Sequence, residues 1–362
     1  MSRFFVDADI SVAQTIDTSV YNSPLIFEEI KEKIFASCWQ FAGTADSLPE
    51  NGSCYPFTLL PHFLDEPLLL ARDESGRIRC LTNVCTHRGN LLIDGPCKVS
   101  SLRCKYHGRL FHLDGRLKSM PEFKEVSNFP SPADDLQELQ LFQWSQFLFT
   151  SVTPAFQPQE FFRDMIARVE WMPVAQFVFQ PALTMEYFVD ANWALYCENY
   201  LEGFHIPYVH AGLNALIDYS NYETELFFPF AVLQIGVGRS VEDCFELPQS
   251  SPDYGKNIAA YYFWVFPNLM FNFYPWGLSI NLVEPLSVDR TKVTFLNFVW
   301  DGSGITRGAG GDLNKVEAED EEIVKKVQRG VRSRFYNHGR YSVKKERGTH
   351  HFHRLLAQFL NS

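Results

Sequence analysis

Two short stretches of the sequence each carry one cysteine and one histidine at a spacing that suits metal binding. Cys85 and His87 form the first pair, and Cys104 and His107 form the second, with sixteen residues between His87 and Cys104. A structural zinc site could use these ligands, but it more often takes Cys–Cys and His–His pairs. Mixed pairs favour a two-iron, two-sulfide cluster in which both thiolates bind one iron and both neutral imidazoles bind the other, which raises the reduction potential.

A second group of candidate ligands begins with His205 and His210, which lie five residues apart. On a straight helix this spacing leaves them out of line, but Pro207 allows the chain to bend between them. Glu202 lies one turn before His205 and shares its face. Alone, the two histidines are a weak signal, and ordinary core or surface histidines are the better explanation of them.

The third ligand of this group would be Asp320. A helix predicted over 313–336 has an apolar stripe, and at 100° per residue Asp320 falls near its centre. The stripe consists of Val316, Ile323, Val324, Val327 and Val331, with Glu317, Glu319, Glu321 and Glu322 to the sides or behind. A buried carboxylate needs a basic partner or a metal. With the two histidines it would form a 2-His-1-carboxylate triad, which holds a ferrous ion and leaves positions open for oxygen.

The order of these motifs resembles that of the catalytic α subunits of Rieske non-heme iron oxygenases. The first motif reads C-x-H and C-x-x-H, followed by Arg88-Gly89 and by Gly108, and the second reads N-Y-x-E-x-x-H-x-x-x-x-H with E-D far downstream. The resemblance covers essentially the whole chain. It implies an α+β fold, with an all-β Rieske iron–sulfur domain (40–152) and a helix-grip, START-like catalytic domain with an antiparallel sheet (153–362). Residues 1–39 would be an N-terminal helical segment associated with the catalytic domain.

The resemblance also implies a function and partners. A separate flavin- or ferredoxin-type reductase, and NAD(P)H only through it, would reduce the [2Fe-2S] cluster at Cys85, His87, Cys104 and His107. The mononuclear Fe(II) at His205, His210 and Asp320 would activate O2 to hydroxylate, or oxidatively N-demethylate, a small substrate. In this family electrons pass between subunits of a homotrimer through a carboxylate, here Glu202. Most members carry Asp at that position, and Glu occurs in relatives resembling carnitine monooxygenases.

Aromatic residues near the middle of the catalytic half are candidates for a substrate pocket. They are Tyr262, Trp264, Phe266, Phe271, Tyr274 and Trp276. A sheet core explains most of them, but a pocket drawing on this set could hold a quaternary ammonium by cation–π contact or an aromatic ring by stacking. The run 266–272 resembles choline- and betaine-type Rieske monooxygenases, which favours a quaternary ammonium substrate. Hydroxylation of an aromatic ring, a Rieske electron carrier without oxygenase activity and a zinc-binding module are the alternatives.

The elements that must position these residues are predicted from hydrophobic period and turn signals. A helix is expected over 24–38, short strands and turns from about 40 to 152, and a helix over 159–170. A strand over 177–189 should precede a helix over 191–204, and four aromatic-rich strands should cover 226–239, 259–274, 278–285 and 291–300. A last helix is expected over 349–360. Strands followed by mixed strands and helices indicate an α+β protein of two domains.

Composition narrows the class of protein further. The 362 residues are 15% aromatic and carry a net charge of −11, which argues against nucleic-acid binding through phosphate contacts. The sequence has no apolar run long enough to span a bilayer and no early signal peptide, so a cytoplasmic chain is expected. Residues 323–354 carry ten Lys or Arg and one acid, a net charge of +9. This stretch is either a solvated helix face or a docking surface for an acidic partner.

Overall fold

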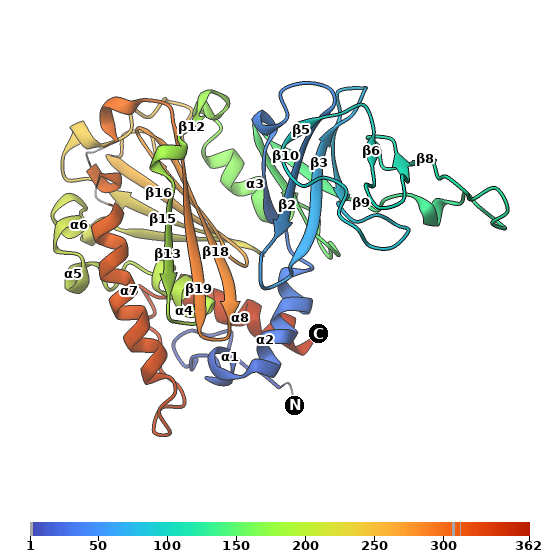
Figure 1. Ribbon diagram of the computed structural model, residues 1–362. Coiled ribbons are helices and arrows are strands. Elements are labelled where there is room, and N and C mark those ends of the chain that lie inside the picture. Colours follow the sequence, from blue (N-terminus) through green and yellow to red (C-terminus); the bar gives the residue numbers. More distant parts are fainter. Residues whose placement is uncertain (1–2, 306–307, 312) are drawn as a thin grey trace. The chain divides into compact units, whose positions relative to one another are not determined.

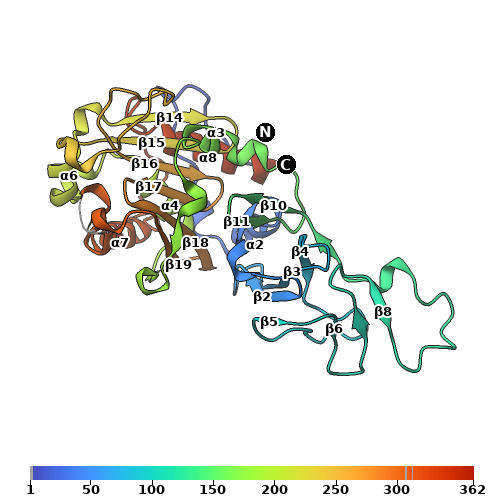
Figure 2. The same ribbon diagram turned by 90° about the horizontal axis from the view of Figure 1, so that it is seen from above.

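The computed structural model describes residues 3–305, 308–311 and 313–362, which form two compact units (Figures 1 and 2). One unit is Ala36–Ala155, and the other combines the described residues before Ala36 with Phe156–Ser362. The first unit is therefore an insertion into the second. Its two ends lie side by side, because the carbonyl of Ala36 accepts hydrogen bonds from the backbone N–H of Thr153 (2.9 Å) and the hydroxyl of Ser151 (3.1 Å).

The inserted unit consists mainly of short antiparallel strands in three sheets. A five-stranded sheet has the order β5-β2-β3-β4-β9, and two three-stranded sheets have the orders β1-β11-β10 and β6-β7-β8. The strands are β1 (Gln40–Thr44), β2 (Ser53–Leu59), β3 (Glu66–Arg72), β4 (Ile78–Thr82), β5 (Cys97–Lys98), β6 (Leu102–Arg103), β7 (Leu110–Phe111), β8 (Leu117–Ser119), β9 (Glu138–Leu139), β10 (Leu141–Trp144) and β11 (Phe147–Thr150).

The central strand β3 shows why this unit holds together. Its apolar run is buried on both faces, and successive side chains of a strand point to opposite sides. Leu69 and Ala71 pack into the core that contains Cys85 and Cys104, whereas Leu68 and Leu70 pack into a second core. The sheet therefore supports the two metal-ligand loops from beneath.

The other unit is built on one antiparallel sheet. Within the described residues its strand order is β12-β19-β18-β17-β16-β15-β14, and β13 also pairs with β19. The strands are β12 (Val178–Phe179), β13 (Met185–Val189), β14 (Glu223–Phe227), β15 (Ala231–Val237), β16 (Ile258–Val265), β17 (Leu269–Tyr274), β18 (Gly277–Ser287) and β19 (Arg290–Val299). β18 and β19 are long and form a hairpin with continuous pairing from Gly277 to Pro285.

This unit also contains the α-helices, which lie on both faces of the sheet and at its edges. They are α1 (Ser19–Asn22), α2 (Pro24–Ile30), α3 (Gln159–Arg168), α4 (Trp193–Tyr200), α5 (Ile206–Val209), α6 (Ala211–Leu216), α7 (Leu313–Gly330) and α8 (Arg347–Asn361). On one face Trp264 contacts Phe352 of α8, with ring centroids 5.2 Å apart. On the other face Phe271 contacts Phe162 of α3 at 6.4 Å. The long helix α7 lies beside α4 on the α8 side of the sheet (Figure 1).

Several predicted elements are shorter than expected, and prolines account for most of the breaks. The strands predicted over 226–239 and 259–274 are each two paired strands that turn near Pro229 and Pro267. The strand predicted over 177–189 is interrupted at Pro181 by a short 3-10 turn. Proline cannot donate to a β ladder, so a strand that contains one ends or bends there.

Most of the predicted helices also end early. The helix predicted over 24–38 is α2 followed by a π-helical turn at Lys31–Phe35, and the one predicted over 313–336 ends at Gly330. The helix predicted over 191–204 ends at Tyr200, so the following five residues are free to turn toward α7. The α+β fold, an all-β unit together with a unit of helices and a large antiparallel sheet, is confirmed. No helix among the described residues is long and apolar enough to cross a membrane.

Candidate active site

The inserted unit brings the four cluster-ligand candidates together. Cys85 and Cys104 are almost fully buried, at 2% exposure each, and their thiols share a hydrogen bond. The rings of His87 and His107 lie 4.8 Å apart, and His107 is exposed. Each loop turns shortly after its histidine, two residues on at Gly89 (φ 70°) and one residue on at Gly108 (φ 75°). Two buried thiols, one half-buried imidazole and one exposed imidazole within these two loops suit the two-iron arrangement that the mixed pairs predicted.

The chemistry of this donor set fits a metal cluster. The Nδ1 atom of His87 is buried and has no hydrogen-bond partner among the described residues. Such an orphaned atom is costly unless it binds something, and a cluster iron would supply the missing bond. Although burial opposes it, hydrogen bonds from the backbone N–H groups of Tyr106 and His107 lower the pKa of Cys104, which favours the thiolate that metals bind.

The second group of candidate ligands lies on two segments that the sheet holds against each other. Asn192 caps α4, its side chain accepting from the N–H of Ala194, and α4 ends at Tyr200. His205 then precedes the single turn of α5, and His210 follows it, with Pro207 at the start of that turn. Asp320 comes from the middle of α7. The bend expected at Pro207 therefore redirects His210 toward the same point as His205.

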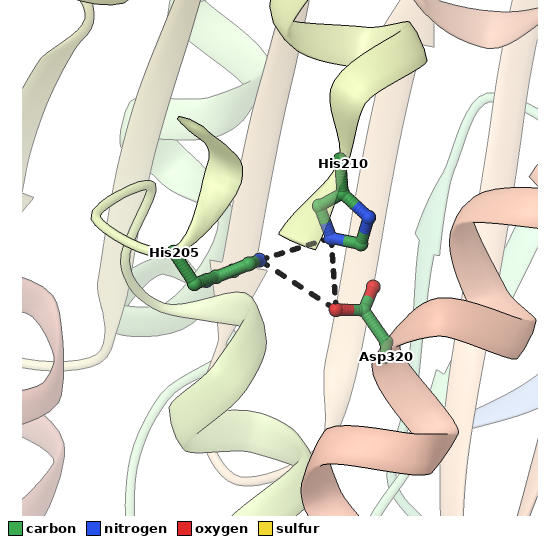
Figure 3. Close-up of side chains that lie close together, drawn as sticks. All are labelled: His205, His210 and Asp320. Atoms are coloured by element: carbon green, nitrogen blue, oxygen red, sulfur yellow. Dashed lines mark hydrogen bonds and ion pairs between the residues drawn. The ribbon is translucent and has the colours of Figure 1, made fainter. Parts of the chain in front are cut away.

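His205, His210 and Asp320 converge with metal-ligand geometry (Figure 3). The Nε2 atoms of the histidines are 3.2 Å apart, and Asp320 Oδ1 is 3.0 Å from His210 Nε2 and 3.5 Å from His205 Nε2. His210 is buried, at 1% exposure. When both Nε2 atoms are unprotonated, they and the Asp320 oxygen repel one another, and a cation between them satisfies all three.

Each histidine is oriented by a carboxylate on its outer nitrogen. His205 Nδ1 donates to Glu202 Oε1 at 2.7 Å, and His210 Nδ1 donates to Glu319 Oε2 at 2.8 Å. Because the proton sits on Nδ1 in both rings, both Nε2 atoms present lone pairs to the inside. Glu202 also accepts from the backbone N–H groups of Phe204 and His205. This arrangement fixes the tautomers that a metal centre requires.

Three further polar side chains lie around the triad and did not stand out from the sequence. Asn199 of α4 donates to Asp320 Oδ1 at 2.6 Å. Glu317 and Glu319, which the helical stripe placed to the sides, both face the site: Glu317 is 3% exposed and accepts from the hydroxyl of Tyr196 at 2.6 Å. Burial, and then the charges of Asp320 and Glu321, raise the pKa of Glu317 to about 8, although the Tyr196 hydrogen bond opposes this. The N-Y and E-D pairs of the motif were the only sequence signal.

A cavity of about 110 Å³ adjoins the triad. Five tyrosines line it, together with both histidines, Glu202 and Asp320; they are Tyr196, Tyr200, Tyr222, Tyr262 and Tyr274. Tyr262 and Tyr274 make a T-shaped contact at 6.0 Å. Burial raises the pKa of all five phenols, so they are neutral rings.

The other predicted pocket residues do not line this cavity. Trp264 and Phe266 lie farther along the sheet, where Phe352 of α8 covers them. Phe271 points to the opposite face, because alternate residues of β17 face opposite sides and Tyr274 faces the cavity. Trp276 stacks on Tyr274 at 5.2 Å but lines a neighbouring cavity of about 530 Å³.

An iron–sulfur unit joined to a unit with a facial triad defines a class of two-centre oxygenases, and comparisons with known proteins agree. Residues 38–130 match the Rieske [2Fe-2S] domain, and residues 169–362 match the catalytic domain of the ring-hydroxylating α subunit. A choline monooxygenase of Arabidopsis thaliana is 31% identical over 95% of this chain and 82% of its own length. A carnitine monooxygenase oxygenase subunit of Escherichia coli is 27% identical over 96% of this chain and 94% of its own length.

Solved structures share the fold. A quaternary ammonium Rieske monooxygenase aligns with a TM-score of 0.80 over 98% of this chain and 99% of that chain, at 23% identity. Naphthalene 1,2-dioxygenase aligns with a TM-score of 0.73 over 96% and 92%, at 16% identity. The chain belongs to the α subunits of the Rieske non-heme iron oxygenases. It is an oxidoreductase with a Rieske [2Fe-2S] domain and a catalytic domain of the mononuclear-iron type, which sets aside the electron-carrier and zinc-module alternatives.

Proposed function

We propose that this chain is the oxygenase component of a monooxygenase that acts on a quaternary ammonium compound. The observation that carries the proposal is the cavity beside the triad, which five neutral tyrosine rings line and in which a substrate would meet the metal. Faces of aromatic rings attract a cation that has no N–H to donate. The choline and carnitine monooxygenases among the relatives support the same substrate class.

In this proposal Cys85, His87, Cys104 and His107 hold the [2Fe-2S] cluster, and His205, His210 and Asp320 hold Fe(II). Iron bound at the triad supplies oxygen activation, with electrons from the cluster. The protein's own contribution is positional. Glu202 and Glu319 keep both imidazoles in the ligating tautomer, and Asn199 orients Asp320 through its 2.6 Å hydrogen bond.

Glu202 is proposed as the electron-transfer bridge between subunits of a homotrimer, with a separate reductase as the electron source. Glu202 is hydrogen-bonded directly to Nδ1 of His205, which is one of the proposed iron ligands. Inter-subunit electron transfer is described for a structurally similar quaternary ammonium Rieske monooxygenase, which supports this role. The extra methylene of Glu relative to Asp is accommodated here, because the carboxylate also caps the N–H groups of Phe204 and His205.

Hydroxylation of an aromatic ring is the competing function within the family. Tyrosine rings would stack on such a substrate as well, and naphthalene 1,2-dioxygenase shares the fold. The cavity places three carboxyl groups, Glu202, Glu317 and Asp320, on its lining. These carboxyl groups favour a cation over a neutral or acidic ring.

Oxygen consumption tests the proposal directly. The purified chain, reconstituted with iron and sulfide and supplied with NADH and a surrogate reductase, should contain three irons per chain. It should consume O2 on addition of choline or another quaternary amine and not on addition of benzoate or naphthalene. Oxygen uptake with the aromatic compounds alone would contradict the proposed quaternary ammonium substrate and favour ring hydroxylation.

A further inference from the structure

The charge of the cavity lining is unusually one-sided. Three carboxyl groups line it, and its lining, taken over the described residues, includes no Lys or Arg. Two of these carboxyl groups already have tasks, because Asp320 belongs to the triad and Glu202 orients His205. Glu317 has no task in the oxygenase mechanism. It is the group whose presence needs an explanation.

Glu317 is buried and only half satisfied. Its Oε2 accepts from the Tyr196 hydroxyl at 2.6 Å, whereas its Oε1 is buried without a hydrogen-bond partner among the described residues. A carboxylate in this state is costly unless a positive charge lies beside it. Burial is the main reason that the pKa of Glu317 is raised, and a cation bound beside it in the cavity would lower that pKa.

A second unpartnered acceptor lines the same cavity. Gln234 donates through Nε2 to the carbonyl of Tyr200, but its Oε1 is buried without a partner among the described residues. The open carboxyl oxygen of Glu317 suits a positive charge, and the open amide oxygen of Gln234 suits a hydroxyl donor. Neither can accommodate a ligand carboxylate, which brings only acceptors.

We infer that Glu317 is the specificity-determining residue that holds the onium charge, and that the cavity selects quaternary ammonium alcohols over quaternary ammonium carboxylates. This inference rests on the proposed function and names its substrate class more narrowly. The three carboxylates around the triad, Glu202, Glu319 and Asp320, outnumber the two charges that a ferrous ion brings. The metal therefore leaves no surplus positive charge for a substrate carboxylate.

Three probes separate charge from shape in the wild-type protein. Choline carries the onium and the hydroxyl, 3,3-dimethylbutan-1-ol keeps the shape and the hydroxyl without the charge, and L-carnitine adds a carboxylate. Anaerobic calorimetry on the iron-loaded chain should show choline binding about 10- to 100-fold more tightly than either other compound. The values of kcat/KM for oxygen uptake should follow the same order.

The variant Glu317→Gln keeps an acceptor for Tyr196 and removes the charge. Its affinity for choline should fall about 10- to 100-fold while its affinity for 3,3-dimethylbutan-1-ol stays within about twofold, and the loss should lie in KM more than in kcat. The matched control is Glu322→Gln on the same helix. That side chain pairs with Lys326 at the surface, lies outside the cavity lining and should leave both affinities unchanged.

The outcomes distinguish the inference from the proposed function. No oxygen uptake with any quaternary amine would overturn the proposed function itself. Wild-type turnover that prefers L-carnitine, or a Glu317→Gln variant that loses affinity for choline and for its neutral analogue equally, would overturn the inference alone. Preference for choline together with the selective loss in Glu317→Gln supports it.

Discussion

At the residue scale, the carboxylates behind the two histidines decide what the triad can bind. Imidazole offers a metal only the nitrogen that carries no proton, and Glu202 and Glu319 place both protons on Nδ1. The inward atoms are then two Nε2 lone pairs and Asp320 Oδ1, all within 4.8 Å of one another. The three ligand atoms are thus already arranged before a metal binds, so little conformational entropy is lost on binding.

Replacing Glu202 tests its proposed role as the electron-transfer bridge. Glu202→Ala should retain the cluster and the mononuclear iron but lose at least about 100-fold in turnover, because the bridge is absent. The rate at which the reduced cluster reoxidises after mixing with substrate and O2, followed by its visible absorbance, should fall in parallel. Glu202→Asp, the residue that most relatives are expected to carry, is the matched control and should recover part of the rate. Normal oxygen-coupled turnover in the alanine variant would contradict the bridge.

The sequence predicted the ligand residues but not what supports them. Cys85, His87, Cys104 and His107 lie within two short loops, so local spacing is enough to find them. His205 and His210 are a weak signal by themselves and became candidates only together with Asp320 and the family resemblance. Glu317 was expected off the apolar stripe of α7, yet it is buried. The buried face of α7 is wider than its apolar stripe, since the site it covers is itself polar. Only the packing of α4 against α7 reveals which acids face inward.

At the element scale, close approach between α8 and the end of α4 sets the position of the segment that carries Glu202. A Cβ built on Gly348 would overlap the carbonyl oxygen of Leu201. That carbonyl belongs to the residue directly before Glu202. Only glycine allows the first turn of α8 to pack so closely there.

Enlarging Gly348 should therefore disturb both stability and the site. Gly348→Ala should lower the free energy of unfolding by about 1–3 kcal/mol, the usual cost of overpacking, and should reduce turnover by displacing the Leu201–Glu202 backbone. Denaturant titration and oxygen uptake measure the two effects. Gly330→Ala at the end of α7 is the control, because a Cβ there meets nothing within 4 Å, and it should leave stability unchanged or slightly higher. Equal stability of the two variants would contradict the close-packing argument.

The sequence left open whether the basic stretch 323–354 is a solvated helix face or a docking surface. Lys325 and Lys326 pair with Glu321 and Glu322 one turn earlier on α7, at 2.8 Å and 2.5 Å. Arg332 pairs with Asp289 at 2.7 Å, and Lys345 lies over the ring of Tyr219. Part of the positive charge is therefore neutralised within the chain, as expected of a solvated helix face.

At the scale of the whole molecule, a buried histidine links stability to pH. His351 of α8 is 4% exposed and donates from Nε2 to the carbonyl of Pro229 at 2.8 Å. Burial lowers its pKa to about 4 from 6.5. As the pH falls from about 6.5 to about 4, the unfolded chain takes up a proton that the folded chain does not, so stability is lost as the pH falls.

The contribution of His351 to the pH dependence of stability can be measured by comparing a His351 variant with the wild-type chain. Over that window His351 should lower the free energy of unfolding by up to about 3 kcal/mol. His351→Gln, which keeps an N–H donor, should lose less stability between pH 7.5 and pH 5 than the wild-type chain does. The exposed His338 provides the control, since His338→Gln should retain the wild-type pH dependence. Identical pH profiles for the His351→Gln variant and the wild type would exclude His351 as the titrating group.

The insertion of Ala36–Ala155 into the other unit has a consequence for biosynthesis. Contacts near the two ends of the chain belong together: Asn361 exchanges hydrogen bonds with the backbone of Phe4, and Tyr21 contacts His353 of α8. The ribosome must add 207 residues after Ala155 before those partners exist, which takes roughly 10–40 s at ordinary synthesis rates. During that interval the sequence of the inserted unit is already complete, so every strand of its three sheets is present before the last helix of the other unit has been made. The N-terminal segment meanwhile waits unpaired, and the mononuclear site can form only when the last third of the chain has emerged.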